Sequence, residues 1–483
     1  MKTKVSVVGA GVGGLATALR LANLGYQVSV YEKLSRCGGR ANIIEEAGFK
    51  IDTGPSFVLM PDLFSEVFSS VGEDINSHLK LKALDTSYKI FYPDSTTLSI
   101  FRDSEKTKEE LEKIEPGSSK AYEYFLAETA DYYKTVKPLL YQCFTSSQLL
   151  NPKYWKLLVK LNPFKTYWQI AKKYFKSDKI CYAFTFEAMF IGVSPFNTPS
   201  FYSIITYADH IQKIHHPVGG MYTIPTALEN LCRQKGVSFN YNCPVRKIIK
   251  RKDGLALHTE SESINTDKVV INADYSFARS QLLGDKIPDY RYSCSVYLIY
   301  LGLNKKVDNL EHHNLFFSSD LRKNLKQIFK SDEVPRDPSF YIHVPTVTDS
   351  SLAPEGKEIV YILIPVPNLK NNPERKFAPY AEGLRGFVFD KVKKQTGVDL
   401  SDFIEFEQSF YPGDFKERYN IKHCATFGLA HTLYQSAFFR PPNLYEKNKN
   451  IYFVGASTQP GGGLPPVIAS SKIVSDAIAA GER

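Results

Sequence analysis

The sequence has no uninterrupted apolar run near the roughly 18 residues that a membrane-spanning helix requires. Its longest apolar stretches, around residues 297–303 and 359–366, are short enough to be buried strands. The seven cysteines are odd in number, and none of them forms a C-x-x-C pair. We therefore expect neither a disulfide framework nor a zinc ribbon, and this cysteine usage fits a reducing compartment best.

The overall composition has no extreme that would exclude a folded protein. Hydrophobic residues make up 43% of the chain and charged residues 23%, which excludes a disordered or collagen-like chain. A length of 483 residues allows about three domains. Lys2 and Lys4 precede an apolar stretch, but glycines interrupt it and no small-residue cleavage site follows, so we do not expect an export signal.

Acidic residues are missing from one long segment. Between Tyr132 and Ser177 there is no Asp, Glu or Arg, and the segment contains nine lysines, at positions 134, 137, 153, 156, 160, 165, 172, 173 and 176. These nine charges equal the formal net charge of +9, so the rest of the chain balances to zero. Eleven of the 46 residues are aromatic, and they include both tryptophans.

Helical spacing separates the lysines of this segment from its apolar residues. Lysines 153, 156 and 160 lie opposite Trp155, Leu158 and Val159, and lysines 165, 172 and 176 lie opposite Tyr167, Ile170 and Tyr174. This pattern is typical of a helix in a bilayer interface, where each well-placed lysine contributes about 1 kcal/mol on anionic lipid. One alternative is a helical layer that packs on the protein's own core. Nucleic acid is a third interpretation, but interleaved aromatics without arginine favour a membrane surface.

A glycine-rich turn near the N-terminus predicts a nucleotide site. Residues 4–8 form a short apolar strand pattern that leads into G-x-G-x-x-G at Gly9, Gly11 and Gly14, and residues 12–22 carry the apolar spacing of a helix. In such a turn the first glycine makes the bend, the second admits a pyrophosphate, and the third lets the helix pack on the strand. The start of the helix also offers free N–H groups to phosphate oxygens.

A second strand pattern, residues 27–31, ends at Glu32, 18 residues after Gly14. A carboxylate there can accept hydrogen bonds from both hydroxyls of a ribose, and its charge would repel a 2′-phosphate. Strand, glycines, helix, strand and acid occur in the right order, which favours nucleotide binding over a simple glycine-rich turn. These residues alone do not separate NAD from FAD.

Two further segments favour an extended dinucleotide. A second Gly-Gly turn followed by Arg40 comes shortly after Glu32, although alone it would more often be a surface loop. Near the C-terminus, the strand pattern at 451–454 leads into a loop rich in Gly and Pro and then a helix over 467–480. Such an open helix start suits an acceptor-rich ligand such as a flavin ring better than a plain connection.

Together with Asp52-x-Gly54-Pro55, these motifs resemble the amine-oxidase-type flavoprotein fold. Later motifs resemble bacterial-type carotenoid desaturases, the family of phytoene and 4,4′-diapophytoene desaturases; they lie at residues 219–221, 292–295, 337–341, 352–356, 427–431, 439–441 and 452–456. The resemblance covers nearly the whole chain and is weakest between about residues 100 and 180.

The resemblance implies an α/β fold in which a Rossmann-like FAD-binding domain is assembled from separated segments. We expect these segments at 1–90, 215–285 and 441–483, with a helical substrate- and membrane-contacting region at 91–214 and an α+β substrate domain at 286–440. The resemblance implies FAD contacts at Gly9, Gly11, Gly14, Glu32, Arg40, Gly54, Pro55, Val245 (backbone, at the adenine), Gly455, Ala456, Leu464, Pro465 and Val467. Two positions depart from the family, which usually has histidine where this chain has Gln459 and Pro442.

The implied reaction is FAD-dependent desaturation of a long polyisoprenoid, with hydride transfer to the flavin. Other flavin-dependent carotenoid enzymes (an oxidase, an isomerase or a saturase), an NAD-dependent dehydrogenase and a non-enzymatic lipid carrier remain alternatives. Asp209 is the nearest candidate for a base, although a structural acid in a salt bridge is the more common role for such a residue. No second G-x-G-x-x-G is present for NAD(P)H, so oxygen or a membrane quinone is the expected electron acceptor.

The histidine pairs 215/216 and 312/313 are not expected to form a metal site. Adjacent residues on a strand point in opposite directions, and no carboxylate or cysteine partner recurs at ligand spacing. The expected location is cytoplasmic and peripheral to the membrane, with a lipophilic polyisoprenoid substrate and no nucleic-acid partner.

Overall fold

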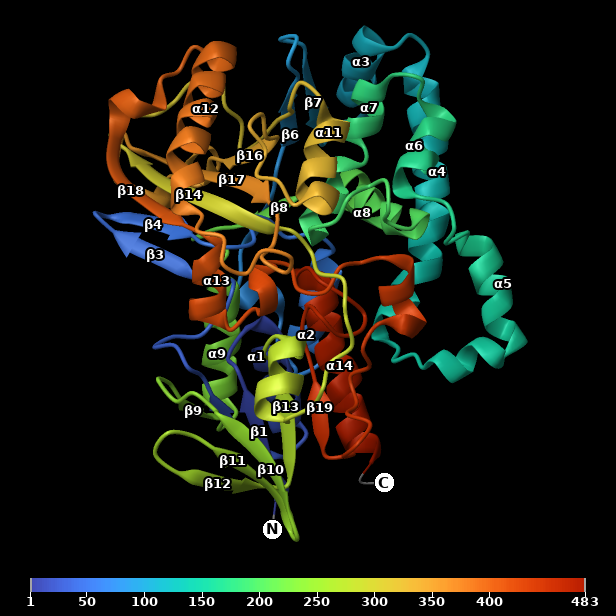
Figure 1. Cartoon of the computed structure of the whole chain (residues 1–483), viewed down its shortest axis with the longest axis vertical. Helices are drawn as coiled ribbons and strands as arrows, with labels where there is room; N and C mark the ends of the chain where they lie inside the picture. Colours follow the sequence, from blue (N-terminus) through green and yellow to red (C-terminus); the bar gives the residue numbers. More distant parts are fainter. Residues whose placement is uncertain (1, 482–483) are drawn as a thin grey trace.

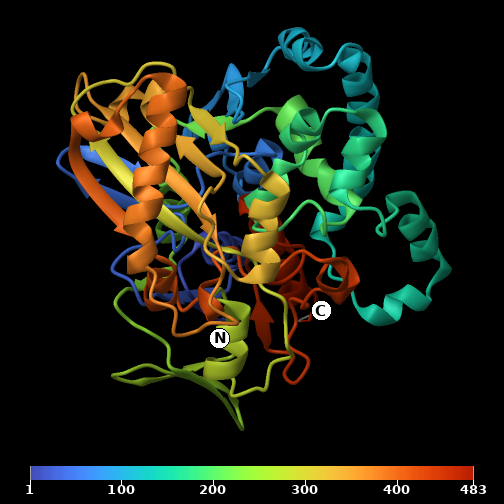
Figure 2. The same ribbon diagram turned by 45° about the horizontal axis from the view of Figure 1, so that its top comes forward.

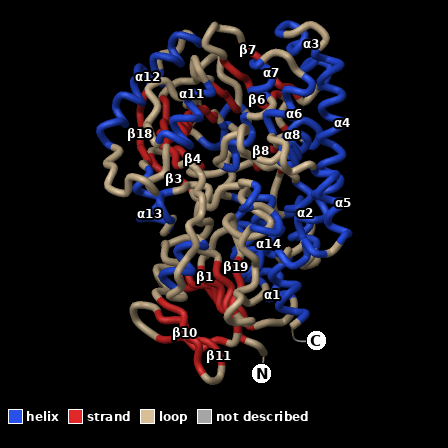
Figure 3. The backbone as a smooth tube through the Cα atoms, turned by 45° about the vertical axis from the view of Figure 1, so that its right-hand side comes forward, coloured by secondary structure: helices blue, strands red, loops and turns tan. Residues whose placement is uncertain are grey.

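The computed structural model describes residues 2–481. Figure 1 shows three parts: a parallel sheet at the lower end, near both chain termini; a larger sheet at the upper left; and a layer of helices at the right. Figure 3 shows that loops from all three parts meet between the two sheets. The site described below lies in this central region.

The parallel sheet has the strand order β19-β13-β1-β2-β9. Its strands are β1 (Lys4–Val8), β2 (Gln27–Tyr31), β9 (Ser238–Asn240), β13 (Lys268–Ile271) and β19 (Ile451–Phe453). The helices around it are α1 (Val12–Asn23), α2 (Pro61–Ser69), α9 (Thr223–Gln234) and α14 (Leu464–Ala480). The expected α/β fold, with a nucleotide sheet built from distant segments, is therefore confirmed.

Short strands and one short helix lie outside the two main sheets. They are the hairpin β3 (Ile43–Glu46) and β4 (Phe49–Asp52), the pair β5 (Leu81–Ala83) and β8 (His215–Pro217), the antiparallel sheet β10 (Lys247–Arg251), β11 (Gly254–His258) and β12 (Ser263–Thr266), and α10 (Tyr275–Phe277). The β5–β8 pair joins the N-terminal segment to the start of the second nucleotide-binding segment.

The larger sheet has the order β18-β14-β17-β16-β15-β6-β7. Its strands are β6 (Thr86–Phe91), β7 (Thr97–Phe101), β14 (Ser295–Leu303), β15 (His313–Phe316), β16 (Phe340–His343), β17 (Glu358–Val366) and β18 (Ile404–Phe410), and its helices are α11 (Leu321–Lys326), α12 (Ala378–Thr396) and α13 (Pro412–Tyr419). The two longest apolar stretches of the sequence are its central strands β14 and β17. Residue 90 lies inside β6, so this sheet also takes in two strands from the N-terminal part of the chain.

The helical layer contains α3 (Ser104–Ile114), α4 (Ser118–Val136), α5 (Pro152–Leu161), α6 (Tyr167–Tyr174), α7 (Asp178–Ala183) and α8 (Ile204–Tyr207). Among residues 2–481, none of the helices combines the length and the apolar character needed to cross a bilayer.

The lysine-rich segment is divided between two different environments. On α6, Tyr167 and Ile170 are buried in the protein core, while Lys172 pairs with Asp178 at 3.0 Å. This helix therefore packs as the core alternative predicts. Helix α5 instead stands away from the body of the molecule (Figures 1 and 2), and its Trp155 is 61% exposed.

Candidate functional site

The glycine-rich turn lies where β1 ends and α1 begins. Gly9 has φ +102°, in the left-handed region that glycine adopts without strain, and its N–H donates to the Tyr31 carbonyl oxygen at 2.8 Å. A Cβ atom on Gly14 would overlap the carbonyl oxygen of Gly9. The third glycine thus allows α1 to pack directly on the end of β1, which leaves the first turn of α1 open to a phosphate group.

Glu32 lies at the end of the neighbouring strand β2. Its carboxylate accepts hydrogen bonds from the N–H groups of Ala10 (2.7 Å) and Leu34 (2.8 Å), so its position is fixed relative to the glycine turn. The side chain is 6% exposed, and burial raises the pKa of its carboxyl above the usual range. Each carboxylate oxygen has a further lone pair for a ribose hydroxyl.

The second Gly-Gly turn lies directly against the first. Gly38 donates its N–H to the Ala10 carbonyl oxygen at 2.9 Å, and Arg40 Nη1 donates to the Thr426 carbonyl oxygen at 2.6 Å. A Cβ atom on Gly54 would overlap the backbone of Arg40, so glycine at this position allows the two backbones to lie close together. The arginine is therefore part of the nucleotide region and is not a solvated residue of a surface loop.

The two ends of the chain meet at this point. A Cβ atom on Gly13 would lie 2.9 Å from Val467 Cγ1 and 3.3 Å from Val454 Cγ2, so the start of α1 packs against β19 and the start of α14. Gly455 has φ +125° and donates its N–H to Ser470 Oγ at 3.2 Å. The C-terminal loop thus completes the site that the N-terminal glycines begin.

One cavity of about 1200 Å³ connects these segments. Twelve of the thirteen residues expected to contact FAD line it: Gly9, Gly11, Glu32, Arg40, Gly54, Pro55, Val245, Gly455, Ala456, Leu464, Pro465 and Val467. Gly14 lies outside the lining, because it faces the backbone of Gly9 and the side chain of Asn272. This set of features fits FAD. It consists of glycine-rich turns from both chain ends, the Glu32 carboxylate as an acceptor for ribose hydroxyls, and the open starts of α1 and α14.

The rest of the cavity is lined mainly by aromatic and aliphatic side chains. They come from the loop before α2, the larger sheet and the helical layer and include Phe57, Phe186, Phe190, Ile205, Leu315, Phe317 and Leu363. Residues of α5 and the loop after it (Leu157, Leu158, Leu161 and Phe164) also line the cavity. The dinucleotide region and this apolar region are one continuous space, suited to a long hydrocarbon beside a flavin.

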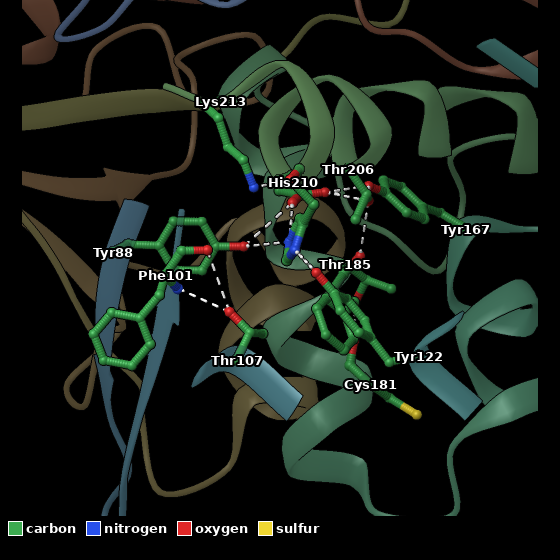
Figure 4. A network of polar contacts seen from close by, with 12 residues as sticks. Tyr88, Phe101, Thr107, Tyr122, Tyr167, Cys181, Thr185, Thr206, His210 and Lys213 are labelled. Carbon is green, nitrogen blue, oxygen red and sulfur yellow. Dashed lines mark hydrogen bonds and ion pairs between the residues drawn. The ribbon is translucent and has the colours of Figure 1, made fainter. Parts of the chain in front are cut away.

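Asp209, the candidate base, lies behind the cavity wall. It is fully buried on the π-helical turn 208–212 and does not line the cavity. Its neighbour His210 contacts the hydroxyls of Tyr122 (2.8 Å) and Tyr88 (3.1 Å), as Figure 4 shows. Burial raises the pKa of the Asp209 carboxyl and lowers that of His210 to about 3, so both groups favour their neutral forms. A role for Asp209 as a base stays a prediction, and the geometry gives it no direct access to a substrate.

The hydrogen bonds of Gln459 account for one of the two departures from the family pattern. Its side-chain amide accepts from the Phe144 N–H (2.6 Å) and donates to the Phe144 carbonyl oxygen (2.8 Å), and it also donates to the backbone of Ala437 and Arg440. This residue therefore holds the loop before α5 against the C-terminal part of the site. At the second position, Pro442, nothing in the structure explains the difference.

We expect Gln459→Leu to destabilise the protein by about 2–4 kcal/mol, because it leaves buried backbone groups of Phe144 without partners. Chemical denaturation of the FAD-loaded protein measures this change. Gln281→Leu is the matched control, since Gln281 is exposed and its side chain is hydrogen-bonded, within residues 2–481, only to Ser280. Equal stabilities of the Gln459 and Gln281 variants would contradict the assigned role.

Sequence reasoning assigned no role to two residues that organise the site, although Asp52 belongs to a motif that it singled out. Asn272, after β13, packs against Gly9, Gly11 and Gly14 and donates to the Gly9 carbonyl oxygen at 3.3 Å. Asp52 accepts from the N–H groups at the start of α9 (Met221, 2.7 Å), and burial raises the pKa of its carboxyl to about 7. The position of Asn272 at the end of a predicted parallel strand was the signal that could have identified it.

Comparison with known proteins agrees with this geometry. Residues 12–307 match the family model described as flavin containing amine oxidoreductase. The chain is 36% identical to a zeta-carotene-forming phytoene desaturase of Myxococcus xanthus, over 98% of this chain and 93% of that protein. It is 35% identical to a 4,4′-diapophytoene desaturase of Staphylococcus haemolyticus, over 98% of both chains.

Solved structures show the same fold at low sequence identity. An oxidoreductase from Methanosarcina mazei superimposes with a TM-score of 0.65 at 15% identity, covering 100% of both chains. A putrescine oxidase bound to putrescine superimposes with a TM-score of 0.63 at 14% identity, covering 99% of both chains. At this level of identity the likeness concerns the fold alone.

Proposed function

Because this chain belongs to the flavin-containing amine oxidoreductase family, we propose that it is an FAD-dependent desaturase of a long polyisoprenoid carotenoid precursor. The observation that carries the proposal is the single cavity in which the dinucleotide loops from both chain ends continue into an apolar region. Relatives named for phytoene and for 4,4′-diapophytoene desaturation are almost equally similar to this chain, at 36% and 35% identity. Both precursors are therefore candidate substrates.

Bound FAD would supply the hydride acceptor for removal of two hydrogens from a CH2–CH2 unit. Glu32, the glycine turns and the start of α14 would hold the cofactor. The aromatic walls would align the hydrocarbon and exclude water, which is the main demand of a reaction whose positive charge the polyene itself disperses. Any proton acceptor must contact the cavity. Asp209 does not line it, so it could accept a proton only by relay through the groups that separate it from the lining.

We also propose that substrate enters from a membrane surface at α5. Leu157 and Leu161 line the cavity on the inner side of this helix, whereas Trp155 and Val159 point outward and are 61% and 82% exposed. Phe164 lines the cavity and is also 81% exposed, so the cavity reaches the surface beside α5. The nearby lysines 153, 156, 160 and 165 are exposed and form no ion pair with any residue of the described range 2–481.

An amphipathic helix with free lysines and outward aromatic and aliphatic groups can insert into an anionic interface. Its inner face would then connect the lipid directly with the cavity. We propose on this basis that the protein binds peripherally to the cytoplasmic face of a membrane, where a quinone as well as oxygen could accept electrons from the reduced cofactor.

The function is tested by expressing the chain in a host that supplies either phytoene or 4,4′-diapophytoene. We expect products with additional conjugated double bonds from at least one precursor, identified by absorption spectra and mass spectrometry. Oxygenated, isomerised or hydrogenated products would instead assign another flavin-dependent carotenoid reaction. Unchanged precursors, in cells that contain the folded flavoprotein, would contradict the proposal.

A further inference from the structure

A cluster of buried histidines lies outside the cavity, between the nucleotide-binding part and the larger sheet. His216 belongs to β8, His312 precedes β15, and His343 ends β16. Their exposed fractions are 0%, 3% and 1%. One ring nitrogen from each lies within 4.8 Å of the corresponding nitrogens of the other two. None of the three residues lines the cavity.

The distances within the cluster suit a tetrahedral metal ion. The Nε2 atoms of His312 and His343 face each other at 3.0 Å, and His216 Nε2 lies 3.4 Å from Asp349 Oδ2. Two ligand atoms of a tetrahedral zinc ion, with bonds of about 2.0–2.1 Å, are about 3.3–3.4 Å apart. A small adjustment of the rings would therefore bring the three imidazoles into coordination, with the Asp349 carboxylate beside His216.

Surrounding groups already orient these ligands. His312 Nδ1 contacts Thr348 Oγ1 at 2.7 Å, which leaves the Nε2 lone pair directed into the cluster. The Asp349 carboxylate is held by the Gly219 N–H at 2.6 Å and by the Ser351 N–H at 3.1 Å. The three histidines lie on strands or at their ends, and such rigid elements preserve site geometry.

Hydrogen bonding alone satisfies the cluster poorly. His216 Nδ1 is buried and has no hydrogen-bond partner within the described range, and the contact of its Nε2 with Asp349 is long. Such incompletely satisfied buried groups are uncommon unless an ion or a water completes them. The neighbouring His313 is bonded through Nδ1 to the hydroxyl of Tyr341 at 2.6 Å and is not a member of the group, so it is not a ligand in this arrangement.

We propose that His216, His312 and His343 bind one structural Zn²⁺ ion, and that Asp349 orients His216 through the contact with its Nε2 atom. From the sequence, a metal site was not expected, because adjacent histidines point in different directions. The fold takes one histidine from each pair and adds His343 from a third segment, while Asp349 contacts His216 from outside the group. Because the three histidines come from both parts of the molecule, the ion would fasten β8, which leads into the Gly219 turn, to the larger sheet.

The test uses the full-length, FAD-loaded protein, purified with a tag that contains no histidine. We expect about one zinc ion per chain by elemental analysis after dialysis against trace zinc. His343→Asn should lower the zinc affinity at least about tenfold, whereas His258→Asn, at the end of β11 in another sheet, should retain the ion. Equal zinc content in wild type and His343→Asn would overturn the proposal.

A second measurement needs no variant, so it remains decisive if His343→Asn folds poorly. Cobalt(II) added to metal-free wild-type protein should give the intense visible d–d absorption of a tetrahedral site, and Zn²⁺ should abolish it. Zinc should also raise the thermal transition, because it binds only the folded chain. Weak absorption typical of octahedral cobalt would contradict the site, whatever the result of the desaturation assay.

Discussion

Gly14→Ala is expected to lower FAD affinity by about 10- to 100-fold, because the added methyl group overlaps the carbonyl oxygen of Gly9. That contact is with backbone, so no side-chain rotation can relieve it, and α1 must move away from β1. The movement displaces the N–H groups that would face the pyrophosphate. FAD content after purification and the dissociation constant from flavin fluorescence measure the loss.

Gly383→Ala is the matched control for this change. Gly383 lies in α12, and a Cβ atom there would meet open space. Alanine is the better helix former, so this variant should keep its FAD and gain up to about 1 kcal/mol of stability. If Gly14→Ala bound FAD as tightly as Gly383→Ala, close packing of α1 on β1 would not be a requirement for cofactor binding.

Replacing the three outward apolar side chains near α5 is expected to abolish membrane binding. Trp155, Val159 and Phe164 are 61%, 82% and 81% exposed, and each would contribute about 1.5–3 kcal/mol if it became buried in lipid. The triple serine variant should therefore bind anionic vesicles at least about 100-fold more weakly, as measured by cosedimentation. Its FAD content should not change, since none of these residues lies near the glycine turns.

The control replaces three exposed apolar residues on other elements: Leu24, Val347 and Tyr380, which are 54%, 48% and 43% exposed. This triple serine variant should bind vesicles like wild type. The α5 variant should still convert substrate presented in detergent micelles, because Phe164, the one replaced residue that lines the cavity, lies at its surface opening. Vesicle binding by the α5 variant that equals wild type would exclude α5 as the contact surface.

Local motifs predicted the nucleotide end of the site well, because their chemistry depends on residues close together in sequence. Gly9, Gly11 and Glu32 lie where the strand–turn–helix pattern places them. The meeting of Gly13 with Val467 is a long-range contact, and only the resemblance to a known fold indicated it. The packing role of Gly14 followed from the same motif, and the structure gives its physical cause, because a Cβ atom there would overlap the carbonyl oxygen of Gly9.

The lysine-rich segment shows why pattern alone was insufficient. Helices α5 and α6 carry the same alternation of lysine with aromatic residues, yet Trp168 of α6 is 9% exposed and Trp155 of α5 is 61% exposed. The two tryptophans differ in exposure because different parts of the chain pack against the two helices. The alternation of lysine with aromatic residues does not predict these packing partners. The position of β6 could not be predicted for the same reason. The sequence of a strand does not specify its partner strands, and β6 pairs within the larger sheet.

The most direct test of the central claim is a crystal structure of the FAD-loaded protein. We predict one FAD molecule whose ribose hydroxyls contact Glu32, whose pyrophosphate lies at the turn of Gly9 and Gly11, and whose flavin ring lies beside Gly455. The ring should border the apolar part of the cavity. If Glu32 and Gly455 contacted different molecules, or if the flavin ring were separated from the apolar part, this account of the enzyme would be contradicted.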